Sequence, residues 1–188
     1  MLRRGEPTKA RILDAAYRLI YARGFARVGV DDIAASAGVT KKTLYYHFES
    51  KDALLASLLE RQSVLALDRI RVAAMSRQGS ARSFVADLFQ ELGAWSQKKR
   101  WTGPGFTRLA LELADLPGHP ARTAARRHKE AVERLLAEEL AKRGLDASRA
   151  AARRIQILLE GAMVLTLIHS DRAYITAAAE TALATLGH

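Results

Sequence analysis

The chain has 188 residues, of which 49% are hydrophobic and 27% are charged, and it carries a formal net charge of +10 with no cysteine. This length suffices for one sizeable core or two small ones, and the composition is typical of a globular protein rather than a disordered one. The missing cysteines exclude disulfides and thiolate metal sites, and they fit a reducing compartment such as the cytoplasm.

The apolar stretches of the chain are too short or too polar for export or membrane insertion. Residues 1–21 are polar and charged where a signal peptide needs an apolar run. The longest apolar run, residues 155–168, includes Gln156 and Glu160 and is shorter than the roughly 20 residues that span a bilayer. We therefore expect a cytoplasmic protein that has no signal peptide and no membrane partner.

Basic side chains are concentrated near the N-terminus. Residues 1–51 hold half of the net positive charge in about a quarter of the chain. The bases there are Arg3, Arg4, Lys9, Arg11, Arg18, Arg23, Arg27, Lys41, Lys42 and Lys51, against Glu6, Asp14, Asp31, Asp32 and Glu49. This distribution favours a polyanionic partner, and nucleic acid in particular, at the N-terminal end.

The predicted secondary structure is helical, because alanine, leucine, arginine and glutamate dominate the chain. In chain order, the apolar spacing predicts helices over about residues 8–23, 31–37, 41–48, 51–79, 81–99, 106–115, 121–143, 147–170 and 173–186. Gly24 ends the first helix and Gly38 allows the turn after the second, while Ser50 is placed to cap the fourth. The sequence thus predicts an all-α protein with a three-helix head, residues 1–50, followed by a six-helix body, residues 51–188.

The second and third predicted helices form a helix-turn-helix unit, because both are short and a glycine-containing turn joins them. Leu44 and Phe48 lie four residues apart and are expected to face inward. The outer surface then carries Thr40, Lys41, Lys42, Thr43, Tyr45 and Tyr46, with Lys51 just beyond the helix. Ammonium groups suit phosphates, hydroxyls suit phosphate oxygens or base edges, and a threonine methyl suits thymine. The alternative is a solvated helix with one exposed tyrosine, but charge, turn and aromatic placement together favour DNA contact.

These residues carry a family resemblance. The segment DDIAASAGVTKKTLYYHFESKDALL, residues 31–55, resembles the DNA-binding signature of the tetracycline-repressor (TetR) family of transcriptional regulators. The matching positions are Ile33, Ala34, Ala37, Gly38, Val39, Thr43, Leu44, Tyr45, Phe48, Lys51, Leu54 and Leu55. Residues 12–25 are similar to the family's first helix, and residues 112–140 and 158–168 are similar more loosely. The resemblance implies a nine-helix TetR-like fold, with a DNA-binding head of residues 1–50 and an effector-binding and dimerisation domain of residues 51–188.

The resemblance also implies how the protein binds DNA. A homodimer would place its two recognition helices in successive major grooves, about 34–36 Å apart, on a palindromic operator. Lys41, Lys42 and Thr43 fall on positions expected to read bases. Tyr45, Tyr46, His47 and Lys51 fall on positions expected to hold phosphates, and Thr40 at the N-cap would direct the helix N-terminus at a phosphate. For His47 a structural or phosphate-binding role is expected rather than a metal, since no second histidine lies at ligand spacing.

Gly29 departs from the family pattern, in which threonine or serine usually precedes the second helix. The hydroxyl that would cap this helix and touch a phosphate is missing, although Gly29 is expected to keep an exposed N–H. Arg27 and Asp31 are the neighbours that could compensate. Arg3 and Arg4 are expected to form a flexible arm that lies near the minor groove or the DNA backbone.

The body is expected to carry the dimer interface and an effector pocket. In this family the last two helices of each subunit pair into a four-helix interface. The candidate interface residues are Leu158, Leu159, Ala162, Leu165, Ile175, Ala179, Ala182 and Leu186, some of which could instead be internal core. The candidate residues for a pocket that binds an unknown small-molecule effector are Trp95, Phe106, Leu109, His128 and Met163, each of which could also be plain core.

Other functional classes have little support. Glu112 and Asp115 lie three residues apart, but such an acid pair is common on protein surfaces, and no nucleophile elbow or phosphate loop is present. We expect no enzymatic activity, no cofactor and no metal site. The function that the sequence predicts is a dimeric transcriptional repressor that leaves its operator when the effector binds. An activator or ligand-independent regulator with the same fold is the alternative, and a basic membrane-surface helical protein is a more distant one.

Overall fold

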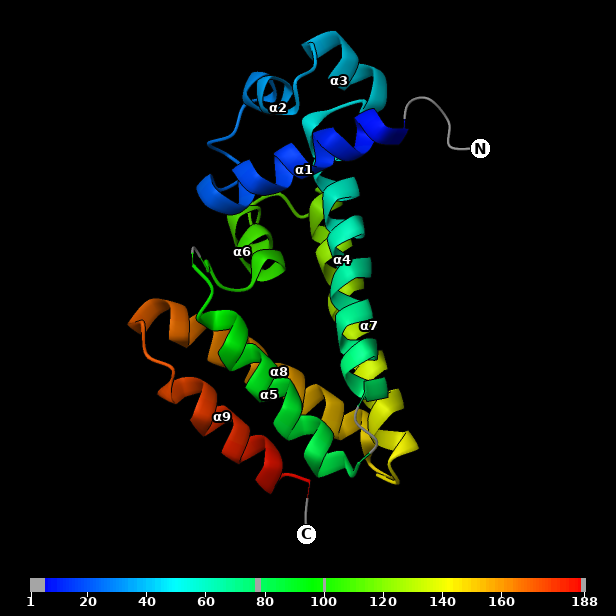
Figure 1. Cartoon of the computed structure of the whole chain (residues 1–188), viewed down its shortest axis with the longest axis vertical. Coiled ribbons are helices and arrows are strands. Elements are labelled where there is room, and N and C mark those ends of the chain that lie inside the picture. Colours follow the sequence, from blue (N-terminus) through cyan, green and yellow to red (C-terminus); the bar gives the residue numbers. More distant parts are fainter. Residues whose placement is uncertain (1–5, 77–78, 100, 187–188) are drawn as a thin grey trace. The chain divides into compact units, whose positions relative to one another are not determined.

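This computed structural model describes residues 6–76, 79–99 and 101–186, and all regular secondary structure within these ranges is α-helical. In chain order the helices are α1 (Glu6–Arg23), α2 (Val30–Ala37), α3 (Lys41–His47), α4 (Lys51–Ser76), α5 (Ala81–Ser96), α6 (Gly105–Glu112), α7 (Pro120–Lys142), α8 (Ser148–His169) and α9 (Ala173–Ala184), as Figure 1 shows. The chain divides into two compact units, which we call unit 1 and unit 2. Unit 1 contains the described residues up to Ser63 and Gly105–Arg126, and unit 2 contains the described residues of 64–104 and those from Arg127 onward.

The all-α prediction is confirmed, and the helix boundaries lie close to the predicted ones. Gly24 ends α1 with a φ of +86° and Gly38 ends α2 with a φ of +64°, both in the left-handed region that glycine accepts. The Ser50 hydroxyl accepts a hydrogen bond from the Ala53 N–H over 3.0 Å and so caps α4 as expected. Both α5 and α6 end three residues earlier than predicted, and α6 ends at Glu112 because the backbone there changes to tight turns in which N–H groups bond to carbonyls three residues back.

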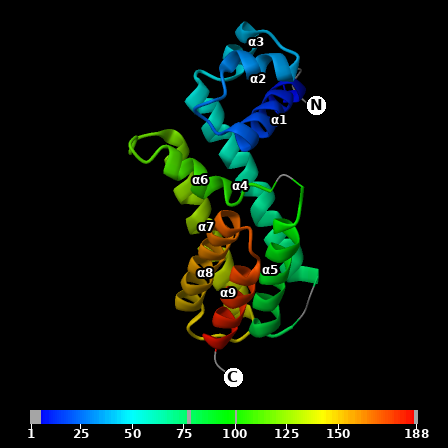
Figure 2. The same cartoon turned by 90° about the vertical axis from the view of Figure 1, so that its left-hand side faces the viewer.

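Unit 1 is built around the packing of α1, α2 and α3, which lie together in Figures 1 and 2. Ile12, Ile33 and Leu44, one from each of these helices, are completely buried in its core. Leu54 and Leu55 of α4 are also completely buried in the same core. The apolar residues that the sequence placed on the inner faces of the helix-turn-helix unit therefore fix α3 by its inner side.

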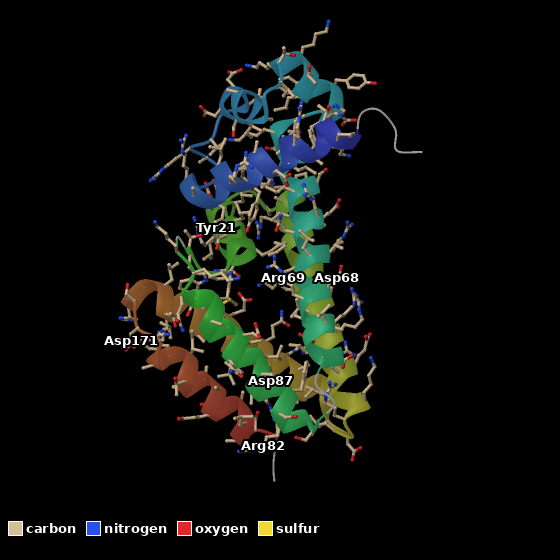
Figure 3. All side chains as sticks on the ribbon, in the orientation of Figure 1. Tyr21, Asp68, Arg69, Arg82, Asp87 and Asp171 are labelled. Atoms are coloured by element: carbon tan, nitrogen blue, oxygen red, sulfur yellow. The ribbon has the colours of Figure 1, made fainter. Side chains whose placement is uncertain are left out.

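Unit 2 contains α5, α8 and α9, which pack side by side in both views. Its core includes Val85 of α5, Leu136 and Leu140 of α7, and Ile155 of α8, all fully buried. Arg82 of α5, labelled in Figure 3, donates a hydrogen bond over 3.2 Å to the backbone carbonyl of Leu183 in α9. Within the described residues, no helix is long and apolar enough to cross a membrane.

An ion-paired cluster on α7 also stabilises unit 2. The buried Glu139 carboxylate accepts hydrogen bonds from Arg143 over 2.6 Å and from Lys142 over 2.7 Å. Burial alone would raise the pKa of Glu139, but the two cations outweigh it and lower the pKa below 4.5. Arg143 also donates to the Ala74 carbonyl over 3.0 Å, so this cluster fixes the end of α4 within unit 2.

Candidate nucleic-acid interface

Helix α3 has a buried apolar side that packs in the core of unit 1 and an exposed polar side. Leu44 and Phe48 are 0% and 3% exposed, respectively, whereas Tyr46 is 84% exposed and Tyr45 is 44% exposed. The ring of Tyr46 makes an edge-to-face contact with that of His47, with 5.2 Å between the centroids. Because α3 is held by its inner residues, the two tyrosines do not contribute to the core and are available for a partner.

The start of α3 is capped as the sequence predicts. The Thr40 hydroxyl accepts a hydrogen bond from the Thr43 N–H over 3.1 Å, and the two hydroxyl oxygens lie 2.8 Å apart within hydrogen-bond distance. This cap fixes the first turn, because it satisfies an N–H group that the helix itself leaves unpaired. The Thr43 hydroxyl is thus already engaged with Thr40 before any DNA is bound.

The three candidate lysines lie in different environments. Lys42 is exposed and makes no ion pair or hydrogen bond within the described residues. Lys41 pairs with Asp31 of α2 over 3.1 Å, but both side chains are more than half exposed, so the pair is weak and a phosphate can compete for the ammonium. Lys51 is half-buried and its ammonium donates to the Phe25 carbonyl over 2.7 Å. That ammonium also lies 4.0 Å from the centre of the Phe25 ring.

The backbone N–H of Gly29 has a hydrogen-bond partner that the sequence analysis did not name. It occupies the N-cap position of α2, and its N–H donates to the Asp32 carboxylate over 2.9 Å. Gly29 is exposed as expected, and Asp32 satisfies its N–H locally from the first turn of the helix. Asp31 pairs with Lys41, and Arg27 makes no hydrogen bond or ion pair within the described residues. The predicted arm of Arg3 and Arg4 lies outside the described residues.

The loop between α1 and α2 is held by residues that the sequence analysis did not connect with DNA binding. Glu112 at the end of α6 accepts hydrogen bonds from the backbone N–H groups of Phe25 and Ala26. His119 makes an edge-to-face contact with the Phe25 ring, with 5.8 Å between centroids, and its Nε2 lies 3.3 Å from the Asp52 carboxylate. Glu112 lies 86 positions after Ala26, so no local sequence pattern could have revealed this contact.

The candidate pocket residues are all packed, but in different cores. Phe106 and Leu109 pack against the core of unit 1, whereas Trp95 and Met163 pack against the core of unit 2. His128 is buried in unit 2, where burial and the neighbouring Lys129 lower its pKa to about 4 against the opposing effect of Glu160. At neutral pH its imidazole is therefore uncharged.

Unit 2 also has an open surface groove of about 740 Å³ between α5 and α9. Its walls include Phe89 and Gln90 of α5 and Ile175 and Ala179 of α9. None of the five candidate pocket residues lines this groove. Within the described residues, no group of three or more histidine, aspartate or glutamate side chains is arranged to hold a metal ion.

Some of the candidate dimer residues lie inside unit 2 instead of on its surface. Ala162, Ile175 and Ala182 are 3%, 5% and 0% exposed and belong to the core between α5, α8 and α9. Because their own chain already covers them, these three residues do not provide surface for a partner chain. Leu158, Leu159, Ala179 and Leu186 are partly buried against the same core, and Leu165 is 39% exposed.

Comparison with known proteins identifies the family to which the chain belongs. Residues 12–58 match the family described as "Bacterial regulatory proteins, tetR family". Residues 80–181, more than half of the chain, match "Transcriptional regulator LmrA/YxaF-like, C-terminal domain". The chain belongs to the TetR family of transcriptional regulators. The family resemblance and the TetR-like fold predicted from the sequence are confirmed, and the matched family is one of regulators and not of enzymes.

Several relatives and solved structures share these features. The chain is 38% identical over 91 residues to the HTH-type transcriptional regulator TtgR of Pseudomonas putida, covering 46% of this chain and 43% of the relative. It is 31% identical over 117 residues to the HTH-type transcriptional regulator EthR of Mycobacterium tuberculosis, covering 60% of this chain and 54% of the relative. The chain thus spans about half the length of these relatives.

The fold extends over nearly the whole chain in the structural comparisons. A TetR-family transcriptional regulator from Streptomyces coelicolor superposes with a TM-score of 0.83 at 28% identity and covers 96% of each chain. The reduced form of Escherichia coli NemR superposes with a TM-score of 0.84, covers 94% of this chain and 96% of that chain, and is 21% identical, which supports the fold alone.

Proposed function

We propose that this TetR-family chain is a dimeric, sequence-specific DNA-binding regulator, and that it is a repressor released from a palindromic operator by a small molecule. Residues 1–50 would bind DNA and residues 51–188 would bind the effector and form the dimer. The observation that carries the proposal is the outer face of α3, where Lys42, Tyr45 and Tyr46 are exposed while Leu44 and Phe48 anchor the helix from within.

The proposed roles of the α3 residues follow from their environments. Lys42 is free to contact a base edge or a phosphate, and Lys41 can do the same after leaving its exposed pair with Asp31. Tyr45 and Tyr46 would donate their hydroxyls to phosphate oxygens. Lys51 still has ammonium protons beyond the one given to Phe25, so it can hold a phosphate while it braces the loop.

Selection of bound sequences from a random DNA pool tests the DNA-binding proposal. The full chain should enrich a palindrome whose half-sites are centred about one helical turn or a small multiple apart. Affinity for the selected DNA should fall steeply with salt, because cations on unit 1 displace counterions from the phosphates. If no sequence is enriched over the starting pool at low salt, the proposal is overturned.

The proposed dimer face is an apolar stripe on α8. Ile157, Gly161, Leu165 and Ile168 recur at three- or four-residue spacing and are all exposed, with Ile157 and Ile168 65% and 66% exposed. An exposed apolar stripe on a helix is typical of a surface that a partner covers. Sedimentation at micromolar concentration should show a dimer, and a monomer would contradict the paired-groove arrangement.

The proposed effector site is supported by buried polar atoms in unit 2. Trp101 Nε1, Gln156 Oε1 and Thr166 Oγ1 are buried and have no hydrogen-bond partner among the described residues. Burying such atoms unpaired costs free energy, so an effector with both donors and acceptors would gain from meeting them. The rings of Trp95 and Trp101 in the same unit meet edge to face, with 5.8 Å between centroids.

Repression and activation can be separated with a reporter gene whose promoter overlaps the selected site. A repressor lowers transcription from this promoter, and a candidate effector that restores transcription should also weaken DNA binding in vitro. Higher transcription in the presence of the protein would instead identify an activator with the same fold.

A further inference from the structure

The loop between α1 and α2 contains an anion-binding turn that α6 fills. Gly24 adopts the left-handed conformation, and the next two backbone N–H groups, those of Phe25 and Ala26, point to one carboxylate. Glu112 Oε2 accepts from Phe25 over 3.1 Å and Glu112 Oε1 accepts from Ala26 over 2.7 Å. Successive N–H groups in such a turn form a concave site for an anion, and a carboxylate strengthens both bonds.

Gly24 leaves the space that this carboxylate needs. A Cβ at Gly24 would lie 3.4 Å from both oxygens of Glu112, and the φ of +86° disfavours any side chain there. The glycine thus allows the helix to end and the carboxylate to approach the two N–H groups at the same point.

Phe25 is held from two further directions. Its carbonyl accepts from Lys51 over 2.7 Å, and its ring contacts the Lys51 ammonium and the edge of His119. Phe25 as a whole is 8% exposed and belongs to the core of unit 1. One residue is therefore fixed at its N–H group, at its carbonyl and at its ring.

The position of Phe25 matters because both ends of the helix-turn-helix unit are tied to it. The chain passes from Ala26 through two residues to Gly29, the N-cap of α2, and α2 packs on α3. Four residues after the end of α3, Lys51 begins α4 and bonds back to Phe25. A loop fixed in this way sets where α2 begins, and through α2 it sets the orientation of α3.

We propose that Glu112 is a positioning residue for DNA binding, which orients α3 through the backbone N–H groups of Phe25 and Ala26 without touching DNA. The proposal rests on the proposed function of α3 as the reading helix. It assigns to α6 an indirect role in DNA recognition, although α6 begins at Gly105 and α3 ends as early as His47.

The direction in which Glu112→Gln changes DNA affinity distinguishes a positioning role of Glu112 from an effect of its charge. Glu112→Gln removes one negative charge from unit 1, and by long-range attraction alone this would leave DNA binding unchanged or tighten it. Glutamine is neutral and has only one acceptor oxygen, so one of the two N–H groups loses its acceptor and the other keeps an uncharged one. Weaker binding by Glu112→Gln would therefore report a loss of positioning.

Asp115→Asn is the matched control. Asp115 is exposed, lies three residues after Glu112, and makes no hydrogen bond or ion pair within the described residues. Its replacement removes the same charge from the same segment without disturbing the loop. Glu112→Asp is a second test variant, because it keeps the charge but withdraws the carboxylate by one methylene.

The experiment measures binding of the full-length variants to the DNA selected by the wild-type protein and to an unrelated duplex. Both Glu112 variants should bind the selected DNA about tenfold more weakly, which is the loss expected for one charge-assisted hydrogen bond. Their binding to the unrelated duplex should stay within about twofold, because it depends on charge alone. Asp115→Asn should behave as wild type or bind slightly tighter.

Two further measurements distinguish a local loss of positioning in the α1–α2 loop from general unfolding of the variants. Circular dichroism should show unchanged helix content for every variant at the temperature of the binding assay. Amide hydrogen exchange should accelerate at Phe25 and Ala26 in both Glu112 variants and remain unchanged in Asp115→Asn. Accelerated exchange throughout unit 1 would mean that Glu112 is only structural, and the proposal would fall.

The outcomes separate this proposal from the proposed function. If wild-type protein selects a DNA sequence and either Glu112 variant binds it as well as Asp115→Asn does, the positioning role is refuted while the proposed function stands. If the wild-type protein selects no sequence, both are refuted.

Discussion

Stability should depend on pH through one buried histidine of α7. His128 is 6% exposed, and burial is the main cause that lowers its pKa from 6.5 to about 4. The ammonium of Lys129 lowers the pKa further, and the carboxylate of Glu160 raises it. Lys129 and Glu160 form an ion pair with each other, so their charges at His128 partly cancel.

Proton linkage gives the sign and the size of the change in the free energy of unfolding with pH. Between pH 6.5 and about 4 the unfolded chain binds a proton at His128 that the folded chain does not bind, so the free energy of unfolding falls as the pH falls. Above pH 6.5 the stabilisation from the neutral imidazole is fully present. At pH 5 the loss reaches about 2 kcal/mol, since each pKa unit corresponds to about 1.4 kcal/mol.

Urea denaturation at pH 7.5, 6.5, 5.5 and 5.0 measures this loss, with His128→Gln as the variant. Glutamine stays neutral throughout, so the variant should lack the decline between pH 6.5 and 5, whatever its stability at pH 7.5. The lowered pKa values of Glu133 and Glu139 affect stability only at lower pH, because both lie below 4.5. Parallel declines in wild type and His128→Gln down to pH 5 would refute the reasoning.

Three further predictions concern DNA binding, assembly and the core. Lys42→Ala should weaken binding to the selected DNA by about 1–3 kcal/mol and relax base preference if this lysine reads a base, whereas Lys98→Ala in unit 2 should leave gel-shift affinity unchanged. Ile168→Asp should shift the sedimentation profile from dimer to monomer because it buries a charge in the proposed interface; Val72→Asp, at a residue that is 65% exposed against 66% for Ile168, is its control and should remain dimeric. Glu139→Ala should lower the free energy of unfolding by about 3–5 kcal/mol because the buried Arg143 loses its carboxylate and keeps only neutral partners; a loss below about 1 kcal/mol would show that water replaces the carboxylate.

The helices could be predicted from the sequence because their ends are marked by local chemistry. Gly24 and Gly38 accept left-handed backbone, and Thr40 and Ser50 supply hydroxyl caps. Each signal acts within about four residues, so one segment contains all the information needed. The inward positions of α3 were predictable for the same reason, since Leu44 and Phe48 occupy one helical face.

The contacts that hold α3 in place could not be predicted in this way. The bonds from Phe25 and Ala26 to Glu112 join residues 86 or 87 positions apart, and nothing near either end identifies the other. In the sequence Glu112 resembles any exposed acid. Its partners are backbone N–H groups, and because nearly every residue has one, no residue type marks them as partners. The engagement of Gly29 by Asp32 is local, but a glycine gives no side-chain signal of which neighbour will satisfy its N–H.

The inner and outer faces of the last two helices were also hard to separate by pattern. Alanine and leucine occur on every side of α8 and α9, so the hydrophobic periodicity does not single out one stripe. Only the packing of α5, α8 and α9 shows that Ala162 and Ala182 are covered while Ile168 is not.

The bonds around Phe25 have a consequence for engineering chimeric regulators. A DNA-binding head transplanted as residues 1–50 would leave behind Lys51, Glu112 and His119, all of which contact Phe25. In such a chimera, the contacts to Phe25 depend on which residues the recipient protein has at the corresponding positions, even when the chimera folds well. The transferable module is unit 1, with the segment Gly105–Arg126 included, because Glu112 and His119 lie in that segment, far along the chain from the loop that they hold.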